Sequence, residues 1–162
     1  MDIVKDWKQI RRQFNRTFRQ NLHVPIASVD SENKPTVTPI GSLFLNNDQT
    51  GFYFEKFPTK LPLHAKSNPN ICALAVNSSK WFWLKSIIRG KFKTNPGIKL
   101  YGQLGERRKA TSNELNRLNR RMKATNGLKG NTYLWKKMDY VRDIIFTKVE
   151  PINLGKMNMG NQ

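Results

Sequence analysis

Apolar residues recur at helical spacing near the start of the chain. They follow one another at intervals of three or four positions, as Ile3, Trp7, Ile10, Phe14 and Phe18. This spacing places the side chains on one face of an α-helix, with most of the basic residues elsewhere on the helix. Asp2 is suited to cap its start. We expect this helix to cover a sheet with its apolar face; binding of a basic amphipathic helix to a membrane surface is the alternative.

Six later segments have the composition of β-strands. They span residues 23–29, 34–44, 52–54, 71–76, 98–104 and 141–149. Pro39 and Gly41 interrupt the second segment, because proline has no N–H for a strand ladder and glycine marks a bulge or a close backbone approach. The interruption either leaves backbone groups free to face a ligand or is a simple bend at the edge of the sheet. The strand spacing predicts an antiparallel sheet or barrel.

Three helices are expected between these strands. A short one should span residues 61–67, and a longer one should follow the capping box formed by Thr111 and Glu114. Another short helix, containing Trp135, is expected over residues 132–138. Leu115, Leu118 and Met122 supply the apolar stripe of the longer helix. Its basic residues are expected on the exposed side, and they are Arg117, Arg120, Arg121 and Lys123.

The aromatic run WFWL at residues 81–84 directly precedes several lysines and arginines. Aromatic side chains interleaved with cations can stack nucleobases. They are also enriched at oligomer interfaces and in the walls of ligand pockets. We favour an interface or a pocket for this run.

The composition limits the class of protein. A length of 162 residues favours one domain. Cys72 is the single cysteine, which excludes an intrachain disulfide and a cysteine-rich zinc site, and its apolar neighbours predict a small buried core residue. The first twenty residues carry charges throughout, and no apolar run approaches the ~20 residues of a membrane span. We therefore expect a cytoplasmic protein.

The formal net charge is +18, and its distribution is uneven. Residues 80–137 hold sixteen basic and two acidic residues, whereas the strand-rich part before them is nearly neutral. Such an excess favours anionic partners, namely phosphorylated ligands, nucleic acid or an acidic membrane surface. A solvated basic surface without a specific partner is the alternative.

Residues suited to catalysis are few. His23 and His64 are the only histidines, and neither lies in a metal-ligand pattern. There is no nucleophile elbow, Walker A loop or G-x-G-x-x-G. An enzyme with this sequence would therefore need a bound organic cofactor to carry its reaction. Thr59 and Lys60 lie between a strand and a helix, where a hydroxyl, an ammonium and free backbone N–H groups suit a phosphate.

The order of these features resembles the pyridoxamine 5′-phosphate oxidase-like group of split barrels that bind flavin mononucleotide (FMN). The matching segments are 27–30, 35–41, 52–54, 59–60, 63, 68–70 and 100–104. The resemblance covers residues 1–155 as a single FMN-binding split-barrel domain and leaves 156–162 as a loosely ordered tail. It implies a mainly β fold, a six-stranded antiparallel Greek-key barrel with flanking helices. It also implies a homodimer with the flavin at the interface.

The resemblance further implies the central residues of an FMN site. Thr59 and Lys60 would hold the flavin phosphate. The stretch Thr38, Pro39 and Ile40 would run beside the isoalloxazine ring, mainly through its backbone.

Other residues would complete this site. Phe54, Glu55 and Lys56 would line the approach to the phosphate. The second subunit would close the pocket, with Trp135 or Trp83 as a contributor.

Two departures from the family pattern bear on the substrate. Pro58 and Thr59 precede Lys60, where pyridoxamine phosphate oxidases carry an Arg-Lys pair, and no arginine-histidine motif follows Arg142. Both differences argue against pyridoxamine phosphate. Members of the group also bind deazaflavin or haem in place of FMN.

The sequence thus predicts an FMN-dependent oxidoreductase of unknown substrate, with unknown catalytic residues and no metal. A non-enzymatic flavin- or haem-binding or sensing protein is the first alternative. Nucleic-acid binding through the basic segment 80–137 is the second.

Overall fold

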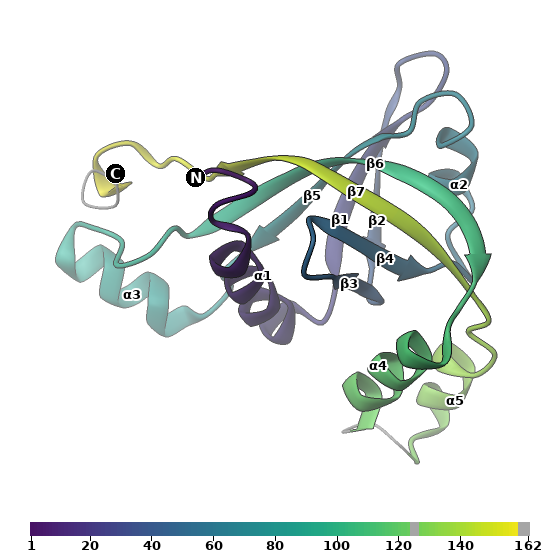
Figure 1. Cartoon of the computed structure of the whole chain (residues 1–162). Helices are drawn as coiled ribbons and strands as arrows, with labels where there is room; N and C mark the ends of the chain where they lie inside the picture. Colours follow the sequence, from purple (N-terminus) through teal and green to yellow (C-terminus); the bar gives the residue numbers. More distant parts are fainter. Residues whose placement is uncertain (124–126, 159–162) are drawn as a thin grey trace.

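The computed structural model describes residues 1–123 and 127–158. It consists of one antiparallel sheet with helices packed around it (Figure 1). The strands are β1 (Val24–Val29), β2 (Pro35–Ile40), β3 (Leu43–Leu45), β4 (Thr50–Phe54), β5 (Asn70–Val76), β6 (Gly97–Lys109) and β7 (Tyr140–Pro151). The helices are α1 (Trp7–Asn21), α2 (Lys60–His64), α3 (Lys80–Arg89), α4 (Ser112–Met122), α5 (Lys129–Trp135) and the 3-10 helix η2 (Gly155–Asn158).

The two edge strands of the sheet are consecutive in the chain. The strand order is β2-β1-β5-β6-β7-β4-β3, and every neighbouring pair is antiparallel. Only Gly41 and Ser42 separate β2 at one edge from β3 at the other. Because the three steps from Ile40 to Leu43 span at most about 11 Å, these ends of the two edges must lie close together. The sheet is therefore a curled half-barrel, as expected for a split barrel.

The prediction of six strands is wrong, because the segment 34–44 forms two strands. Ser42 causes the division. Its Oγ accepts a hydrogen bond from the backbone N–H of Phe54 (3.1 Å) and donates one to the backbone carbonyl of Phe54 (3.2 Å). Beyond this side-chain bridge the chain pairs with β4, whereas before it the chain pairs with β1. Within the described residues the sheet therefore has seven strands, and the Greek-key connection stays a prediction.

The predicted apolar face of the first helix is confirmed. Its buried apolar residues are Trp7, Ile10, Phe14 and Phe18. The helix begins at Trp7, because Asp2 caps a preceding turn instead: its Oδ1 accepts from the backbone N–H of Val4 (2.9 Å) and Lys5 (2.8 Å). Together with β1, β5, β6 and β7, α1 encloses the main core.

Strand β4 is buried on both faces. Successive side chains of a strand point to opposite sides. Tyr53 accordingly packs in the main core, whereas Phe52 and Phe54 pack in a second cluster with Leu118 and Met138. In Figure 1, α4 and α5 lie together at the end of the sheet that carries this second cluster.

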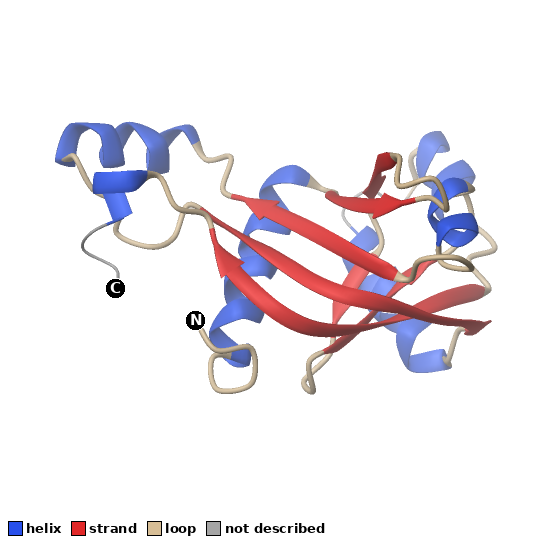
Figure 2. Cartoon of the chain, turned by 90° about the horizontal axis from the view of Figure 1, so that it is seen from above, coloured by secondary structure: helices blue, strands red, loops and turns tan. Residues whose placement is uncertain are grey.

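The aromatic run 81–84 belongs to α3, where the sequence predicted no helix. The Oγ of Ser79 accepts from the backbone N–H of Phe82 (3.4 Å), and Gly90 ends the helix with a φ of +62°. Figures 1 and 2 show α3 near the C-terminal residues, at the end of the sheet opposite α4 and α5. There the backbone N–H of Phe92 donates to the carbonyl of Met157 in η2 (2.9 Å), so part of the predicted tail packs on the domain. The rest of that tail, 159–162, lies outside the described residues.

The sequence predicted Cys72 as a small buried core residue. Cys72 is half-buried on β5 rather than enclosed in the core, because its side chain lies on the opposite strand face from buried Ala73. Burial nevertheless raises the pKa of its thiol.

None of the helices within residues 1–123 and 127–158 has the length and apolar character needed to cross a lipid bilayer.

Candidate functional site

An apolar cavity of about 390 Å³ lies where β2 gives way to β3. Its walls come from the end of β2, the end of β4 and the segment around the end of α5. The lining residues are Thr38, Pro39, Ile40, Gly41, Ser42, Phe54, Phe57, Pro58, Leu134, Trp135 and Met138. The fold thus brings together five of the predicted site residues from three distant parts of the sequence. The five are Thr38, Pro39, Ile40, Phe54 and Trp135.

Six lining residues were not predicted, and they are Gly41, Ser42, Phe57, Pro58, Leu134 and Met138. Phe57 and Pro58 lie between the aromatic strand and the predicted phosphate turn and could have been inferred from that position. The sequence signal for Leu134 and Met138 was that they lie together with Trp135 in the segment 132–138, which has the length of a short helix. Nothing in the local sequence indicated that this group faces β2.

Glu55 joins strands and does not line the cavity. Its carboxylate accepts hydrogen bonds from the hydroxyl of Tyr53 (2.8 Å) and from the Nε and Nη2 atoms of Arg142 (Nη2 at 3.1 Å). The Nε of Arg107 lies 3.3 Å from the same carboxylate. The hydrogen bonds to Glu55 raise the pKa of Arg142, and burial followed by the Glu55 charge raises the pKa of Tyr53. Glu55 therefore holds β4, β6 and β7 together.

Lys56 is not among the lining residues of the apolar cavity, but it contacts the segment that forms one wall of it. Its Nζ donates to the backbone carbonyls of Tyr133 (3.2 Å) and Lys136 (2.7 Å) at the end of α5. These bonds hold the segment that carries Trp135 against the end of β4. Lys56 is thus a positioning residue for the cavity.

Thr59 and Lys60 lie at the start of α2, next to the lining residue Pro58, and both are exposed. Lys60 lines a second hollow of about 500 Å³, whose other residues are Asp30, Ser31, Glu32, Thr36, Leu63, His64, Lys66 and Ser67. Thr36 of this hollow and Thr38 of the apolar cavity project from the same side of β2, two residues apart. At about 3.4 Å per residue, the two sites follow one another along one strand.

The two histidines lie outside the apolar cavity. His64 is buried, and its Nδ1 lies 2.9 Å from the Oγ of Ser28, so it joins α2 to β1. His23 is exposed before β1. Among the described residues, no group of three His, Cys, Asp or Glu side chains could hold a metal ion.

Trp83 lies on α3 in a separate aromatic cluster. Its ring centroid is 5.9 Å from that of Phe82 and 5.5 Å from that of Phe92, and its Nε1 donates to the carbonyl of Asn77 (2.6 Å). The residues of the apolar cavity do not include it. A contribution of Trp83 to the site of a second subunit stays a prediction.

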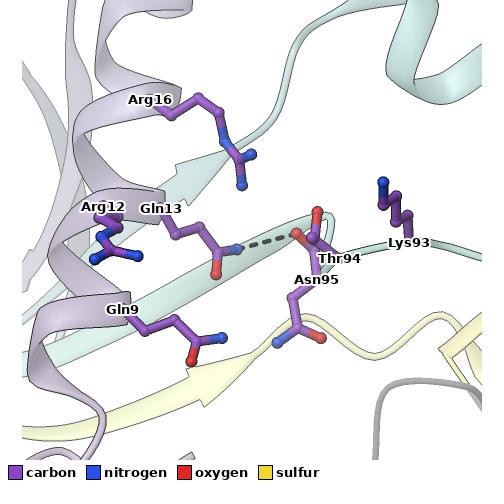
Figure 3. A pocket seen from close by; sticks show the side chains of 7 residues that line it. All are labelled: Gln9, Arg12, Gln13, Arg16, Lys93, Thr94 and Asn95. Atoms are coloured by element: carbon purple, nitrogen blue, oxygen red, sulfur yellow. Dashed lines mark hydrogen bonds between the residues drawn. The ribbon is translucent and has the colours of Figure 1, made fainter.

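A polar hollow of about 500 Å³ lies between α1 and the loop before β6 (Figure 3). Its residues are Gln9, Arg12, Gln13, Arg16, Lys93, Thr94 and Asn95. Figure 3 shows Gln13 pointing at Asn95, to whose carbonyl its Nε2 donates (3.0 Å). This bond ties α1 to the loop, and the exposed arginines stand beside it.

No protein-family model and no curated protein sequence matches the chain. Solved structures match over most of its length. An FMN-binding protein from Syntrophomonas wolfei subsp. wolfei has a TM-score of 0.60 at 14% identity, covering 94% of this chain and 96% of that one. A candidate pyridoxamine 5′-phosphate oxidase from Lactobacillus delbrueckii has a TM-score of 0.51 at 15% identity, covering 86% and 90%. The haem storage protein HutZ from Vibrio cholerae has a TM-score of 0.52 at 12% identity, covering 93% and 95%.

These similarities extend over nearly the whole sheet and its helices, and they agree with the curled antiparallel strand order. The chain therefore has the split-barrel fold of the pyridoxamine 5′-phosphate oxidase-like proteins.

Proposed function

We propose that this protein binds FMN, with the isoalloxazine ring in the apolar cavity. The observation that carries the proposal is the cavity itself, which gathers backbone from β2 and aromatic side chains from β4 and α5. Cofactor sites are typically concave and mostly apolar, with a few polar groups that fix orientation. Here those polar groups would be the backbone around Pro39 and the hydroxyl of Thr38.

The neighbouring hollow suits the phosphate of the same ligand. Lys60 and Lys66 both line it. The two acidic residues beside them are engaged locally: Asp30 accepts from the backbone N–H of Lys34 (2.9 Å), and Glu32 pairs with the Lys34 ammonium (2.5 Å). Within the described residues, Lys60 has no ion-pair partner, so its charge is available to a phosphate.

The lining of the cavity supports one type of cofactor over the other. Proteins with this fold include an FMN-binding protein and a haem storage protein, so the fold alone supports either ligand. Haem iron needs an axial ligand such as His, Cys, Met or Tyr. In the part of the chain that the structure describes, Met138 is the only such residue that lines the cavity, and no histidine lines it. This composition favours a flavin over a haem.

We further propose that a homodimer encloses the flavin and that the protein is a flavin-dependent oxidoreductase. Bound FMN would supply the electron-transfer chemistry. The residues of this chain would bind the phosphate, hold the ring against β2 and exclude water with Trp135. Because the described residues that line the cavity include no titratable side chain, a non-enzymatic flavin-binding role is the second candidate.

The absorbance spectrum of the purified protein tests the cofactor. We expect flavin bands in the protein as isolated or after incubation with FMN. A protein that stays colourless and leaves the fluorescence of added FMN unquenched would refute the proposal. Rapid reduction of the bound flavin by a nicotinamide nucleotide, with turnover, would distinguish an oxidoreductase from a binding protein.

Two substitutions test the phosphate site. Thr59→Ala and Lys60→Ala should each weaken FMN binding, because hydrogen bonds to charged groups contribute about 1.5–3 kcal/mol. Lys8→Ala, on the exposed side of α1, is a control for loss of one positive charge. Equal affinities in the wild type and in both site variants would place the phosphate elsewhere.

A further inference from the structure

A groove of about 650 Å³ lies between α1 and α4, above β3. It is lined by five arginines, which are Arg11, Arg19, Arg117, Arg120 and Arg121. Its remaining residues are polar or apolar but uncharged, namely Asn15, Phe18, Leu22, Phe44 and Leu45. The described residues that line the groove thus include no carboxylate.

Two of these arginines are fixed in place, although the sequence predicted both on the exposed side of the helix. The guanidinium carbon of Arg121 lies 3.4 Å from the ring centroid of Phe44 and 4.2 Å from that of Phe18. Its Nη1 donates to the carbonyl of Leu43 (2.7 Å). Stacking on aromatic rings orients a guanidinium and leaves its other N–H groups free to donate.

Arg117 is held in the same way, one helical turn earlier. Its guanidinium carbon lies 5.1 Å from the ring centroid of Phe44. Its two terminal nitrogens donate to the side chain of Asn46 (2.7 Å) and to the carbonyl of Leu45 (2.9 Å). All its partners are neutral, so these contacts position the positive charge without compensating it.

Within the described residues, no carboxylate forms an ion pair with the arginines of the groove. Glu114 attracts Arg117 only at longer range, because its carboxylate pairs with Arg108 (2.7 Å), and Asp48 attracts Arg11 while it accepts a hydrogen bond from Thr50 (2.6 Å). Burial, followed by the charge of Arg117, lowers the pKa of Arg121. The Nε of Arg11 is buried and, in the described structure, has no hydrogen-bond partner. Desolvated cations of the same sign destabilise a fold unless an anion joins them.

The polar hollow in Figure 3 lacks these features. Its arginines, Arg12 and Arg16, are exposed on α1, and no aromatic side chain is among its lining residues. Their charge is solvated, so it needs no bound anion. The groove between α1 and α4 is therefore the stronger candidate for an anion site.

We propose that this groove binds a phosphorylated small molecule, whose phosphate oxygens accept hydrogen bonds from Arg117, Arg120 and Arg121. Planar guanidinium groups match phosphate in paired hydrogen bonds, and several of them around one site favour more than one negative charge. Pyrophosphate and a nucleoside triphosphate share this chemistry. The groove shares no lining residue with the apolar cavity, so the inference does not rest on the proposed FMN site.

Calorimetric titration of the full chain with sodium pyrophosphate, and separately with ATP, tests the proposal at matched ionic strength. We expect saturable binding at one site. Binding of both probes would show that the phosphates alone are recognised, and binding of ATP only would identify a nucleotide site; either supports the proposal. Absence of saturable binding for both, or tighter arginine-dependent binding of a short duplex DNA, would overturn it.

Variants link the binding to the groove. Arg121→Met keeps the apolar packing on Phe44 and should weaken binding about tenfold or more. Without ligand its melting temperature should equal or exceed that of the wild type, because an uncompensated buried charge is removed. Arg120→Gln is a second variant that should fold normally, since Arg120 is exposed and its Nε donates to the carbonyl of Asn116 in its own helix (3.4 Å). Arg12→Met, in the polar hollow, is the matched control, and a loss there equal to that of Arg121→Met would refute the site.

Discussion

The Cη2 atom of Trp135 lies 3.1 Å from the position that a Cβ atom at Gly41 would occupy. The indole therefore rests on the two-residue connection that carries the chain from one edge of the sheet to the other. A side chain at position 41 cannot be accommodated unless the indole moves. Since Trp135 also forms a wall of the apolar cavity, this contact couples the sheet connection to the shape of the proposed flavin site.

Gly41→Val should therefore weaken FMN binding about tenfold and lower the free energy of unfolding by about 1–3 kcal/mol, the usual cost of overpacking. Flavin fluorescence titration and urea denaturation measure the two effects. Gly130→Ala is the matched control, because a Cβ atom there meets open space within α5. We expect it to leave binding unchanged and to stabilise the helix by about 0.5–1 kcal/mol. Wild-type FMN affinity in Gly41→Val would contradict the role of Trp135 as a wall.

A second prediction concerns the carboxylate of Glu55, whose side chain is 6% exposed and contacts Arg142 and Arg107. Glu55→Gln should lower the free energy of unfolding by about 3 kcal/mol, because it leaves the guanidinium of Arg142, whose side chain is 13% exposed, without its counter-charge. Urea denaturation monitored by tryptophan fluorescence measures the change.

The control for Glu55 is Glu32, whose carboxylate pairs with Lys34 but is 69% exposed. Glu32→Gln should change the stability by no more than about 1 kcal/mol, as usual for surface ion pairs. If Glu55→Gln and Glu32→Gln lowered the free energy of unfolding by the same amount, burial would not explain the contribution of the Glu55 ion pairs to stability.

The local pattern of the sequence predicted most elements of the fold. Helical spacing identified the buried face of α1, and the strand segments matched the sheet except for 34–44. Pro39 and Gly41 showed that this segment is interrupted. They could not show that β2 and β3 lie at opposite edges, because that depends on Ser42 bonding to Phe54, twelve positions away. The helix α3 was missed although Ser79 and Gly90 were suitable caps, since the aromatic residues between them drew a functional interpretation.

The site was predictable only where it depends on neighbouring residues. Residues on β2 and β4 reach the cavity because the strands themselves place them there. Glu55 turns inward because Arg142, far along the chain, supplies its partner. Arg121 is half-buried because Phe18 and Phe44 present their rings to it, and these belong to different elements. Such long-range contacts leave no trace in the spacing of residues near each position.

A third prediction concerns the pH dependence that Glu114 contributes. Burial alone would raise the pKa of its carboxyl, but hydrogen bonds from Arg108 and from the backbone of Thr111 outweigh burial and hold the pKa below its usual range. The ionised form therefore stabilises the fold above the unfolded-state pKa of about 4.3, and this contribution is lost as the pH falls through the lower folded-state pKa. The stability difference between the wild type and Glu114→Gln should be constant above about pH 5 and shrink below about pH 4. Urea denaturation across this range measures it, and a difference that grows on acidification would contradict the assignment.

The last prediction compares two serines that are equally buried, Ser42 and Ser86, each 4% exposed. In Ser42→Ala, both the N–H and the carbonyl of Phe54 lose their partner at the division of the strand, so we expect a loss of about 1–3 kcal/mol in the free energy of unfolding. Ser86 donates to the carbonyl of Phe82 within α3 (2.7 Å), an oxygen positioned to accept the helical backbone bond as well. Ser86→Ala should therefore cost less than about 1 kcal/mol. Urea denaturation of both variants measures the two losses in the free energy of unfolding. Equal losses would mean that the side chain of Ser42 does not replace the missing backbone pairing.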